Sequence, residues 1–375
     1  MSYDPGASGI SGAPDVAFGT KTDGQVITYD QALDKWRNLS PSASGVPWLV
    51  QPSSSTVDAG PLIQAALDTY GVAWIAAGTW RLNSTVTIDD GQSIIGQGQG
   101  TTILKCYTGL TGLNGIELAS GTSSHFTIQG IEIHGGGYAT NGLYFYATSA
   151  PTAPDISPDF VPVMRDVSVH DCTSNGIFVG GSYSGGLRES RFINLLLKHN
   201  GSWGLYLQSS DCFLSDITCH GNGGSAGGFY INGGNAKLSN CKAYYEEVGI
   251  QGVSTRMTVM GGEIQDCARA ITTSTDTYLN LTVDSCGTTT QGAVLIGGNG
   301  CTVNLHFVGR TKPSGAPGYS VGSACLEMST NTITMSGFVN TNMLGRTNDY
   351  SALYYGANRP DSDSVMTYAP STVTP

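Results

Sequence analysis

The sequence has few charged side chains and no long apolar run. Asp, Glu, Lys and Arg make up 12 % of its 375 residues, and the formal net charge is -11. Because no Lys/Arg-rich stripe is available to neutralise phosphates, we expect no nucleic-acid partner. No segment approaches the roughly 20 consecutive apolar residues that span a bilayer, so we expect a soluble protein with no membrane insertion.

The sequence also lacks the marks of export and of metal binding. Residues 1–6 have neither a basic start nor an apolar core, so no secretory signal peptide is expected. The nine cysteines are an odd number, and Cys219 and Cys241 fall at expected inward positions, which favours buried thiols over disulfides. No Cys or His pair has zinc-type spacing, and Asp155, Asp159 and Asp166 form no convincing calcium cluster. We expect no metal, no cofactor, and assembly in a reducing cytosol.

The sequence is rich in glycine, with 52 residues, and it contains an internal repeat. A phrase of the form apolar, any, small polar, apolar, any, apolar recurs, and a glycine followed by alternating apolar residues stands between its copies. The combined unit of roughly 20 to 30 residues is typical of a solenoid. Copies of the first phrase cover residues 128–133, 164–169, 192–197, 214–219, 238–243 and 259–264; copies of the second begin at Gly115, Gly142, Gly176, Gly204, Gly228 and Gly249.

Alternation with a period of two predicts that each phrase is a strand with one buried face. Asn-Gly pairs stand before the glycine-led strands, and we expect them to supply left-handed or tight turns at the corners. Short strands joined by fixed corners predict the stacked coils of a parallel β-helix. An antiparallel sandwich is the alternative, but its hairpins do not require the same phrase order to recur. These pairs begin at Asn141, Asn175, Asn200 and Asn222.

Residues 58–70 predict an amphipathic helix that closes the first coil. Asp58 can cap its start and Pro61 fits the first turn. Leu62, Ile63, Ala66 and Leu67 form the expected apolar stripe. A solenoid needs such a cover because an open terminal coil exposes apolar core and unpaired edges.

The region from this helix to about residue 104 resembles the opening of pectate-lyase-like proteins. The matching features are the helix, strands at 73–75, 80–82 and 85–88, and the glycine-rich corner at 94–98, although Ala76 and Ala77 stand where proline is usual. The resemblance covers about residues 47–310 and implies a right-handed parallel β-helix, all-β in class. Members of that family include lyases, hydrolases, epimerases and phage tailspikes, so the fold does not specify the reaction.

The N-terminal segment resembles a module found upstream of receptor-facing domains in phage tail proteins. Asp23-Gly24, the strand after it, Tyr29 and Trp36 carry the likeness. This resemblance implies attachment to other tail proteins and a homotrimer located in the virion. The expected organisation is an attachment module and linker (1–45), a cap with the first coils (46–112), the β-helix body (113–310), and C-terminal coils or a trimerisation segment (311–375).

Register within the repeat places outward side chains in columns, about 4.8 Å apart from coil to coil. One polar column is expected to bind a linear, anionic or hydroxyl-rich polymer, and it contains His134, His170, Lys198, His220, Tyr244 and Gln265. The column one residue further contains Gly135, Asp171, His199, Gly221, Tyr245 and Asp266.

A third column is aromatic, and its role stays open among sugar stacking, contact with a neighbouring chain, and cover by a loop. It contains Glu117, Tyr144, Phe178, Tyr206 and Tyr230, with Trp203 as a further sugar-stacking candidate. Loops grafted on a rigid solenoid often carry specificity, and the proline-rich insertion at residues 147–162 is expected to project as one.

Glycosidic cleavage would need two carboxyl groups, about 5 Å apart for retention or about 6.5 to 9.5 Å apart for inversion. Glu246 with Asp266 is the first candidate pair, with Asp171 as a partner across the groove. Lyase chemistry would instead use a base among His170, Lys198, His220 and Tyr244. Each of these side chains could equally cap a turn or be solvated.

Three functions therefore stay open. The leading hypothesis is a phage tailspike or tail fibre that binds, and in some forms depolymerises, a host surface polysaccharide. The second is a freestanding bacterial polysaccharide lyase or glycoside hydrolase, and the third is a purely structural virion protein.

Overall fold

The computed structural model describes most of the chain between residues 49 and 308. The described ranges are 49–119, 125–147, 161–181, 187–223, 226–253, 256–273, 276–287, 293–296 and 301–308, together with the backbone of six short strands elsewhere. The expected linker after residue 39, most of the insertion at 147–162 and most of the segment 311–375 lie outside the described residues. No helix in the described part is long and apolar enough to cross a membrane.

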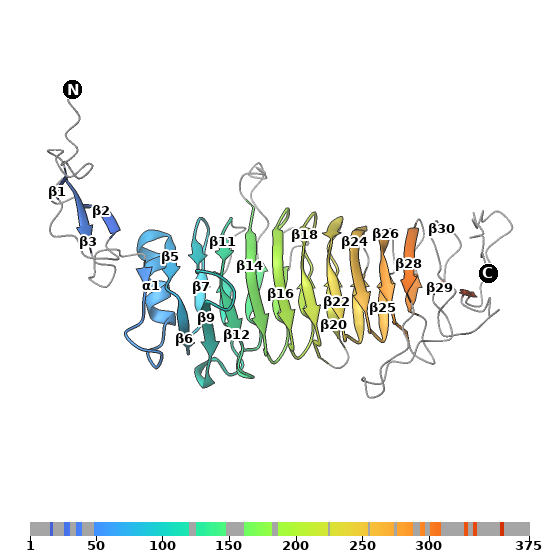
Figure 1. Cartoon of the computed structure of the whole chain (residues 1–375), viewed down its shortest axis with the longest axis horizontal. Helices are drawn as coiled ribbons and strands as arrows, with labels where there is room; N and C mark the ends of the chain where they lie inside the picture. Colours follow the sequence, from blue (N-terminus) through green and yellow to red (C-terminus); the bar gives the residue numbers. More distant parts are fainter. Residues whose placement is uncertain are drawn as a thin grey trace, which may run out of the picture.

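Strands of this chain form three sheets (Figure 1). A three-stranded sheet contains β1 (Val16–Ala17), β3 (Lys35–Leu39) and β2 (Val26–Asp30). An eleven-stranded sheet contains β7 (Val86–Ile88), β10 (Ile116–Leu118), β13 (Leu143–Ala147), β15 (Ile177–Gly181), β17 (Leu205–Leu207), β20 (Gly227–Ile231), β23 (Val248–Gly252), β25 (Arg269–Thr273), β27 (Val294–Ile296), β29 (Leu326–Met328) and β31 (Leu353–Tyr355).

The third sheet has seventeen strands. It contains β4 (Leu49–Val50), β5 (Val72–Ile75), β6 (Gly78–Leu82), β8 (Ser93–Ile95), β9 (Thr102–Cys106), β11 (Thr127–Gln129), β12 (Glu132–His134), β14 (Val163–His170), β16 (Arg191–Lys198), β18 (Phe213–Ser215), β19 (Thr218–His220), β21 (Ala236–Ser239), β22 (Lys242–Tyr244), β24 (Met257–Gln265), β26 (Thr277–Asp284), β28 (Cys301–Val308) and β30 (Ile333–Met335).

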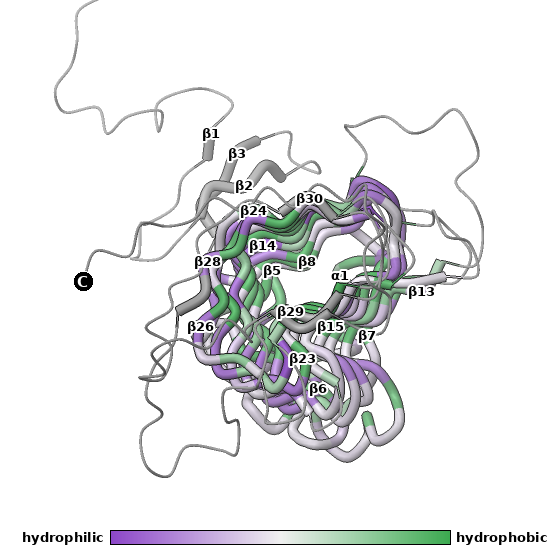
Figure 2. The backbone as a smooth tube through the Cα atoms, turned by 90° about the vertical axis from the view of Figure 1, so that its right-hand side faces the viewer, coloured by the Kyte–Doolittle hydropathy of each residue, from purple (hydrophilic) through white to green (hydrophobic). Residues whose placement is uncertain are grey.

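Every pairing in the two large sheets is parallel, so the chain advances by one coil each time it returns to the same sheet. β13, for example, pairs with β15 in one sheet, while β14 pairs with β16 in the other. The coils lie over one another when the molecule is viewed along its length (Figure 2). The repeated phrases therefore form a parallel β-helix, as predicted, and not an antiparallel sandwich.

The seventeen-stranded sheet consists of two rows that meet at a bend. We call them the first row, which includes β8, β11 and the start of β14, and the second row, which includes β9, β12 and the end of β14. A residue in the left-handed region, which glycine, Asn and Asp tolerate best, makes the bend in six of the coils. These residues are Gly130, Asp166, Asn194, Asp216, Asn240 and Gly261.

A second left-handed residue makes the corner that follows the second row. Asp171, His199, Gly221, Tyr245 and Asp266 hold this position, with φ between 50° and 59°. The expectation that the Asn-Gly pairs supply these turns is wrong, because none of the four asparagines has a positive φ. Their side chains turn inward instead.

The asparagines form hydrogen-bonded ladders between coils. Asn200 Oδ1 accepts the backbone N–H of Cys172 at 3.2 Å, and Asn222 Oδ1 accepts that of Asn200 at 3.1 Å. In a second ladder Asn175 donates to Asn141 at 3.0 Å. Each ladder satisfies corner N–H groups that lie too deep for water, which explains why these polar side chains are buried.

The interior is apolar and contains thiols. The eight described cysteines are all buried and none is joined in a disulfide, which confirms the prediction for Cys219 and Cys241. Several follow a left-handed residue directly, as Cys172 follows Asp171, because the chain turns inward at that point. Burial raises the pKa of Cys106 and of Cys241 to about 12, so these thiols stay protonated.

Helix α1 (Gly60–Tyr70) packs on β5 and β7 at the start of the solenoid. Ile63, Ala66 and Leu67 are buried as predicted, but Leu62 is 42 % exposed and faces away from the core. Asp58 precedes the helix, and its carboxylate accepts the backbone N–H groups of Gly60 at 3.0 Å and Asn83 at 2.9 Å. It therefore connects the helix to the following coil.

Candidate functional site

The predicted polar column exists, and it runs along the outer edge of the second row. Strand pairing places His134 beside His170, His170 beside Lys198, Lys198 beside His220, and His220 beside Tyr244, which is followed by Gln265. The same register extends the column toward the N-terminus through Lys105 and Arg81. We call this set the groove column.

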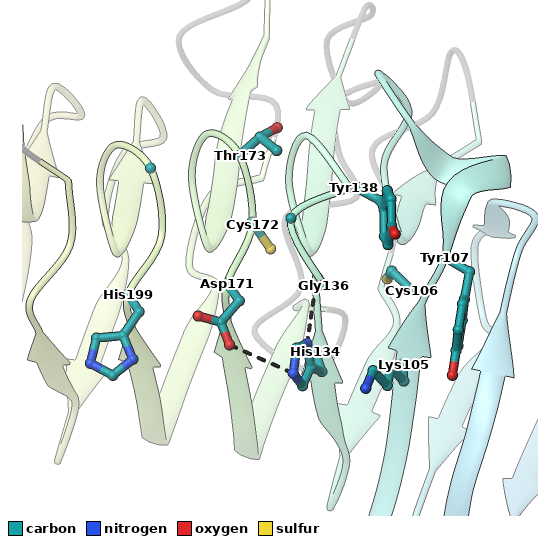
Figure 3. A pocket seen from close by; sticks show the side chains of 12 residues that line it. Lys105, Cys106, Tyr107, His134, Gly136, Tyr138, Asp171, Cys172, Thr173 and His199 are labelled. Carbon is teal, nitrogen blue, oxygen red and sulfur yellow. Dashed lines mark hydrogen bonds and ion pairs between the residues drawn. The ribbon is translucent and has the colours of Figure 1, made fainter.

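A hollow of about 690 Å³ lies on the groove column at its N-terminal half. Figure 3 shows the side chains of Tyr107, Lys105, His134, Asp171 and His199 following one another along it. Since these residues come from successive coils, the hollow extends along the axis of the solenoid. Tyr138 and Thr173 complete one side of it.

His170 lies at the centre of the cluster beneath this hollow. Its Nδ1 is 2.7 Å from Asp171 Oδ2, and its Nε2 is 3.0 Å from Glu132 Oε1. The His170 side chain is 9 % exposed, whereas that of Asp171 is 41 % exposed. The Asp171 carboxylate in the hollow is therefore oriented by the His170 ring beneath it, and the Glu132 carboxylate in turn orients that ring.

His134 completes the cluster from the neighbouring coil. Its Nε2 is 3.7 Å from Asp171 Oδ2, and its Nδ1 accepts the backbone N–H of Gly136 at 3.0 Å. Burial and the nearby His170 lower the pKa of His134, so this ring is neutral at neutral pH. A neutral imidazole that accepts at Nδ1 carries its proton on Nε2, where it faces Asp171.

His134, His170 and Asp171 bring three potential metal-ligand atoms within 4.8 Å of one another. The proton positions oppose metal binding, however. A metal-bound histidine usually donates a hydrogen bond with its second nitrogen, and here that nitrogen of His134 faces a donor, the N–H of Gly136. The donor set therefore fits a hydrogen-bonded cluster better than a metal site.

Aromatic rings line the C-terminal half of the groove column. The His220 and Tyr244 rings stack with centroids 4.2 Å apart, and His199 lies 5.1 Å from His220. Burial, His199 and Lys198 lower the pKa of His220. Tyr245, at the next left-handed corner, is 40 % exposed. This half presents ring edges and one cation, Lys198, along the surface.

The predicted aromatic column lies on the eleven-stranded sheet and is continuous. Tyr144, Phe178, Tyr206 and Tyr230 occupy equivalent positions, and their rings stack with centroid distances of 4.9, 4.9 and 4.3 Å. Within this stack both faces of Phe178 and Tyr206 are covered by neighbouring rings. Sugar stacking is therefore confined to the ends of the ladder and to ring edges.

Trp203 is only 8 % exposed, and its ring packs 5.3 Å from that of Tyr230. Trp203 was expected at the corner beside Gly204, as a sugar-stacking candidate. In the structure it covers one end of the aromatic ladder, so its ring face is not available to a polymer.

The expectation for Glu246 differs most from the structure. This side chain is fully buried, and its two oxygens accept the backbone N–H of Asn222 at 2.8 Å and the Asn222 side-chain amide at 2.9 Å. It follows the left-handed Tyr245 and turns inward, as Cys172 and Asn200 do at equivalent positions. Glu246 is thus the third side chain of an internal ladder, and it does not face Asp266 across a surface groove.

Asp266 stays at the surface, at a left-handed corner where Gln265 donates to its Oδ2 at 3.0 Å. The residues that the sequence analysis missed are Arg81, Lys105, Tyr107, Tyr138 and Glu132. Arg81 and Lys105 could have been found by extending the column one and two coils toward the N-terminus. Glu132 could not, because its role depends on a contact across 38 residues with His170.

A family model described as the right-handed β-helix region matches residues 142–311. The solenoid is right-handed. The fold is shared with bacteriophage CBA120 tailspike protein 2, whose enzymatically active domain is 15 % identical with a TM-score of 0.58; 84 % of this chain and 50 % of that chain are covered. The chain thus spans half the length of that tailspike domain.

Two further solved structures share the fold. ORF18 of Geobacillus virus E2 is 14 % identical, with a TM-score of 0.55, over 84 % of this chain and 68 % of that one. The A-module of mannuronan C-5 epimerase AlgE6 from Azotobacter vinelandii is 12 % identical, with a TM-score of 0.53, over 83 % of this chain and 100 % of that one. None of the curated proteins matches the sequence. The fold thus occurs in phage tail proteins and in carbohydrate-active enzymes.

Proposed function

We propose that this protein is a tailspike or tail fibre protein of a bacteriophage, and that it binds a host cell-surface polysaccharide along the groove column. The observation that carries this proposal is the column itself. Seven coils in succession place Arg81, Lys105, His134, His170, Lys198, His220 and Tyr244 at one register position, beside a hollow that extends along the solenoid axis.

A linear polysaccharide fits this arrangement for a physical reason. Its hydroxyl and acid groups recur along one direction, and the groove column offers hydrogen-bond donors and ring edges that recur along the same direction, about 4.8 Å apart. The proposed carbohydrate-binding residues are His134, Lys198, His220, Tyr244 and Tyr245, to which the structure adds Arg81 and Lys105. His170, expected among them, is buried with both ring nitrogens on carboxylates, so it positions Asp171 and does not contact the polymer. Tyr206, Tyr230 and Trp203 pack into the aromatic ladder, and we do not include them in this surface.

The virion context supplies the remaining parts of the proposal. Residues 1–45, which contain the three-stranded sheet, attach the protein to other tail proteins; α1 caps the first coil; and the protein is a homotrimer in the phage tail, assembled in the host cytoplasm. The aromatic ladder on the eleven-stranded sheet is the candidate trimer contact, since half-buried aromatics in a continuous line usually mark an interface. The similarity in fold to a phage tailspike supports this context.

A depolymerase activity would use carboxylates near the groove column. Asp171 is the first candidate, because it lies in the hollow and His170 fixes its orientation. Asp266 stands at the same corner position further along the column. Glu246 is not proposed as a catalytic acid, since both of its oxygens are buried against Asn222.

Binding of purified surface polysaccharides from candidate hosts tests the proposal. We expect Lys105→Ala to weaken binding, because it removes a cation from the hollow. Lys237→Ala is the matched control: it removes the same charge from the exposed face of the first row, where Lys237 lies 4.7 Å from the Phe213 ring. Equal effects of both variants would show that binding does not use the groove column.

Turnover is measured on the same polysaccharides with Asp171→Asn, Asp266→Asn and Glu246→Gln. Loss of cleavage with binding retained in Asp171→Asn would identify a depolymerase. Binding by wild-type protein without any cleavage would identify an adhesin. Loss of cleavage in Glu246→Gln alone would contradict the exclusion of this buried residue.

A further inference from the structure

Three cations of the groove column have no carboxylate partner among the described residues. Arg81 lies 4.5 Å from the Tyr107 ring and Lys105 lies 6.0 Å from it, but neither forms an ion pair there, and neither does Lys198. Lys242, two residues before Tyr244 on the same strand, shows the contrast, since its Nζ is 2.9 Å from Glu263 Oε2. In a chain of net charge -11, unpaired cations at one register position indicate an anionic ligand.

The cations are not evenly spaced. Arg81 and Lys105 lie on adjacent coils, whereas Lys105 and Lys198 are separated by the coils of His134 and His170. Three coil steps correspond to about 14 Å. The positive charge of the column is therefore concentrated at two points.

The space between these points carries the opposite charge. His134 is neutral at neutral pH because burial and His170 lower its pKa. The Asp171 carboxylate lies in the hollow, with Oδ2 directed at the two histidines and its side chain 41 % exposed. A ligand lying along the column thus meets two cations, then an uncharged ring and a carboxylate, then a third cation.

We infer that the groove selects an anionic polysaccharide whose acid groups lie on about every third sugar. This inference rests on the proposed function and names the class of polymer that the site accepts. One sugar of an extended chain is about as long as one coil step, so an acid group opposite Arg81 and Lys105 places the next acid group opposite Lys198. The two sugars between these acid groups present hydroxyl groups to His134 and Asp171.

The same pattern acts against a polymer with an acid on every sugar. Such a polymer places a carboxylate opposite Asp171, where like charges repel and the two histidines beneath the hollow are already directed at Asp171. Asp171 is therefore a specificity-determining residue as well as part of the polar column. Its substitution by Asn removes the repulsion, and Asn also tolerates the left-handed φ of 56° at this corner.

The test compares polymers of one length but different acid spacing. The probes are a capsular polysaccharide with one uronate in each linear trisaccharide repeat, a phosphate-bearing polymer with the same repeat length, polygalacturonate with an acid on every sugar, and neutral dextran. We expect the wild-type protein to bind one or both of the widely spaced polymers more tightly than polygalacturonate, and dextran weakest. The comparison of uronate with phosphate identifies the acid group.

Variants make the test specific to the charges. Asp171→Asn should strengthen polygalacturonate binding by roughly two- to fivefold, and Lys198→Ala should weaken binding of the spaced polymer by a similar factor. Lys237→Ala should change neither. If polygalacturonate binds the wild type as tightly as the spaced polymers, or Asp171→Asn leaves its affinity unchanged, the inference is wrong while the proposed function stands. If no polysaccharide binds at all, the proposed function itself fails.

Discussion

His170 and Asp171 are adjacent in sequence, yet one is buried below the hollow and the other lies in it. His170 Nδ1 is 2.7 Å from Asp171 Oδ2, and the left-handed φ of 56° at Asp171 turns the chain so that this contact forms. On its other side His170 meets Glu132 at 3.0 Å. The orientation of the one carboxylate among the described lining residues of the hollow thus depends on a buried ring.

Removal of this ring should affect both binding and stability. His170→Ala leaves Glu132 without its partner and frees Asp171 to rotate. We expect a loss of about 1–3 kcal/mol in the free energy of unfolding, measured by urea denaturation. His170→Gln is the milder variant, since an amide can still donate to one carboxylate. Equal stability of His170→Ala and the wild type would show that the cluster does not contribute to the fold.

Glu246 should make stability depend on pH. Burial raises the pKa of Glu246 to about 8 from 4.5, against the two hydrogen bonds from Asn222, which lower it. The folded chain therefore keeps a proton that the unfolded chain loses above about pH 4.5, and stability falls as the pH rises from about 4.5 to 8. The total loss is at most on the order of 5 kcal/mol.

Glu246→Gln removes this ionisation, and its amide oxygen can still accept one of the two hydrogen bonds from Asn222. We expect its melting temperature to exceed that of the wild type increasingly between pH 5 and pH 9. Glu246→Ala is the control, because it loses the Asn222 contacts at every pH. A constant difference between Glu246→Gln and the wild type over this range would contradict the assigned pKa.

The aromatic ladder should contribute to stability within one chain. Tyr206 stacks on Phe178 at 4.9 Å and on Tyr230 at 4.3 Å, so Tyr206→Ala opens the middle of the ladder. We expect a loss of about 2–4 kcal/mol in the free energy of unfolding, from lost burial and two ring contacts. Tyr278→Ala, on the first row and 39 % exposed, is the matched control and should cost less than 1 kcal/mol.

The same variant also tests the proposed trimer contact. Sedimentation measures whether Tyr206→Ala changes the oligomeric state of the full chain. A shift to monomers, with Tyr278→Ala unchanged, would support contact through this sheet. An unchanged oligomer with lower stability would mean that the ladder serves the single chain.

Binding of an acidic polymer should strengthen on acidification. The pKa of His134 is lowered by burial and by His170, so His134 is neutral at pH 7 and gains its proton only below its ordinary pKa of about 6.5. Protonation of His134 adds a cation between Lys105 and Asp171. Protonation of His220, whose pKa burial also lowers, adds a second cation further along the column. Titration of binding from pH 7.5 to pH 5 should show this increase, and His134→Gln should reduce it. An identical pH profile for His134→Gln would exclude His134 as a contributor.

The sequence by itself determined the solenoid. Two phrases with a period of two, repeated every 20 to 30 residues or so, leave few folds other than stacked coils, and they also fix which side chains share a column. His134, His170, Lys198, His220 and Tyr244 could be aligned in this way because strand register is a local property. The buried thiols follow from the same register.

The tertiary structure determined the side-chain directions at the corners and the contacts between coils, which local sequence patterns do not encode. The sequence does not show that the residue after a left-handed corner turns inward, so Glu246 was expected at the surface but is buried. The asparagines were expected to make the tight turns, which residues such as Asp171 and Tyr245 make instead. Contacts between coils, such as Glu132 with His170 across 38 residues, depend on the pitch of the solenoid and on side-chain direction. These contacts form only when the coils stack, because stacking brings corners distant in sequence within hydrogen-bonding distance.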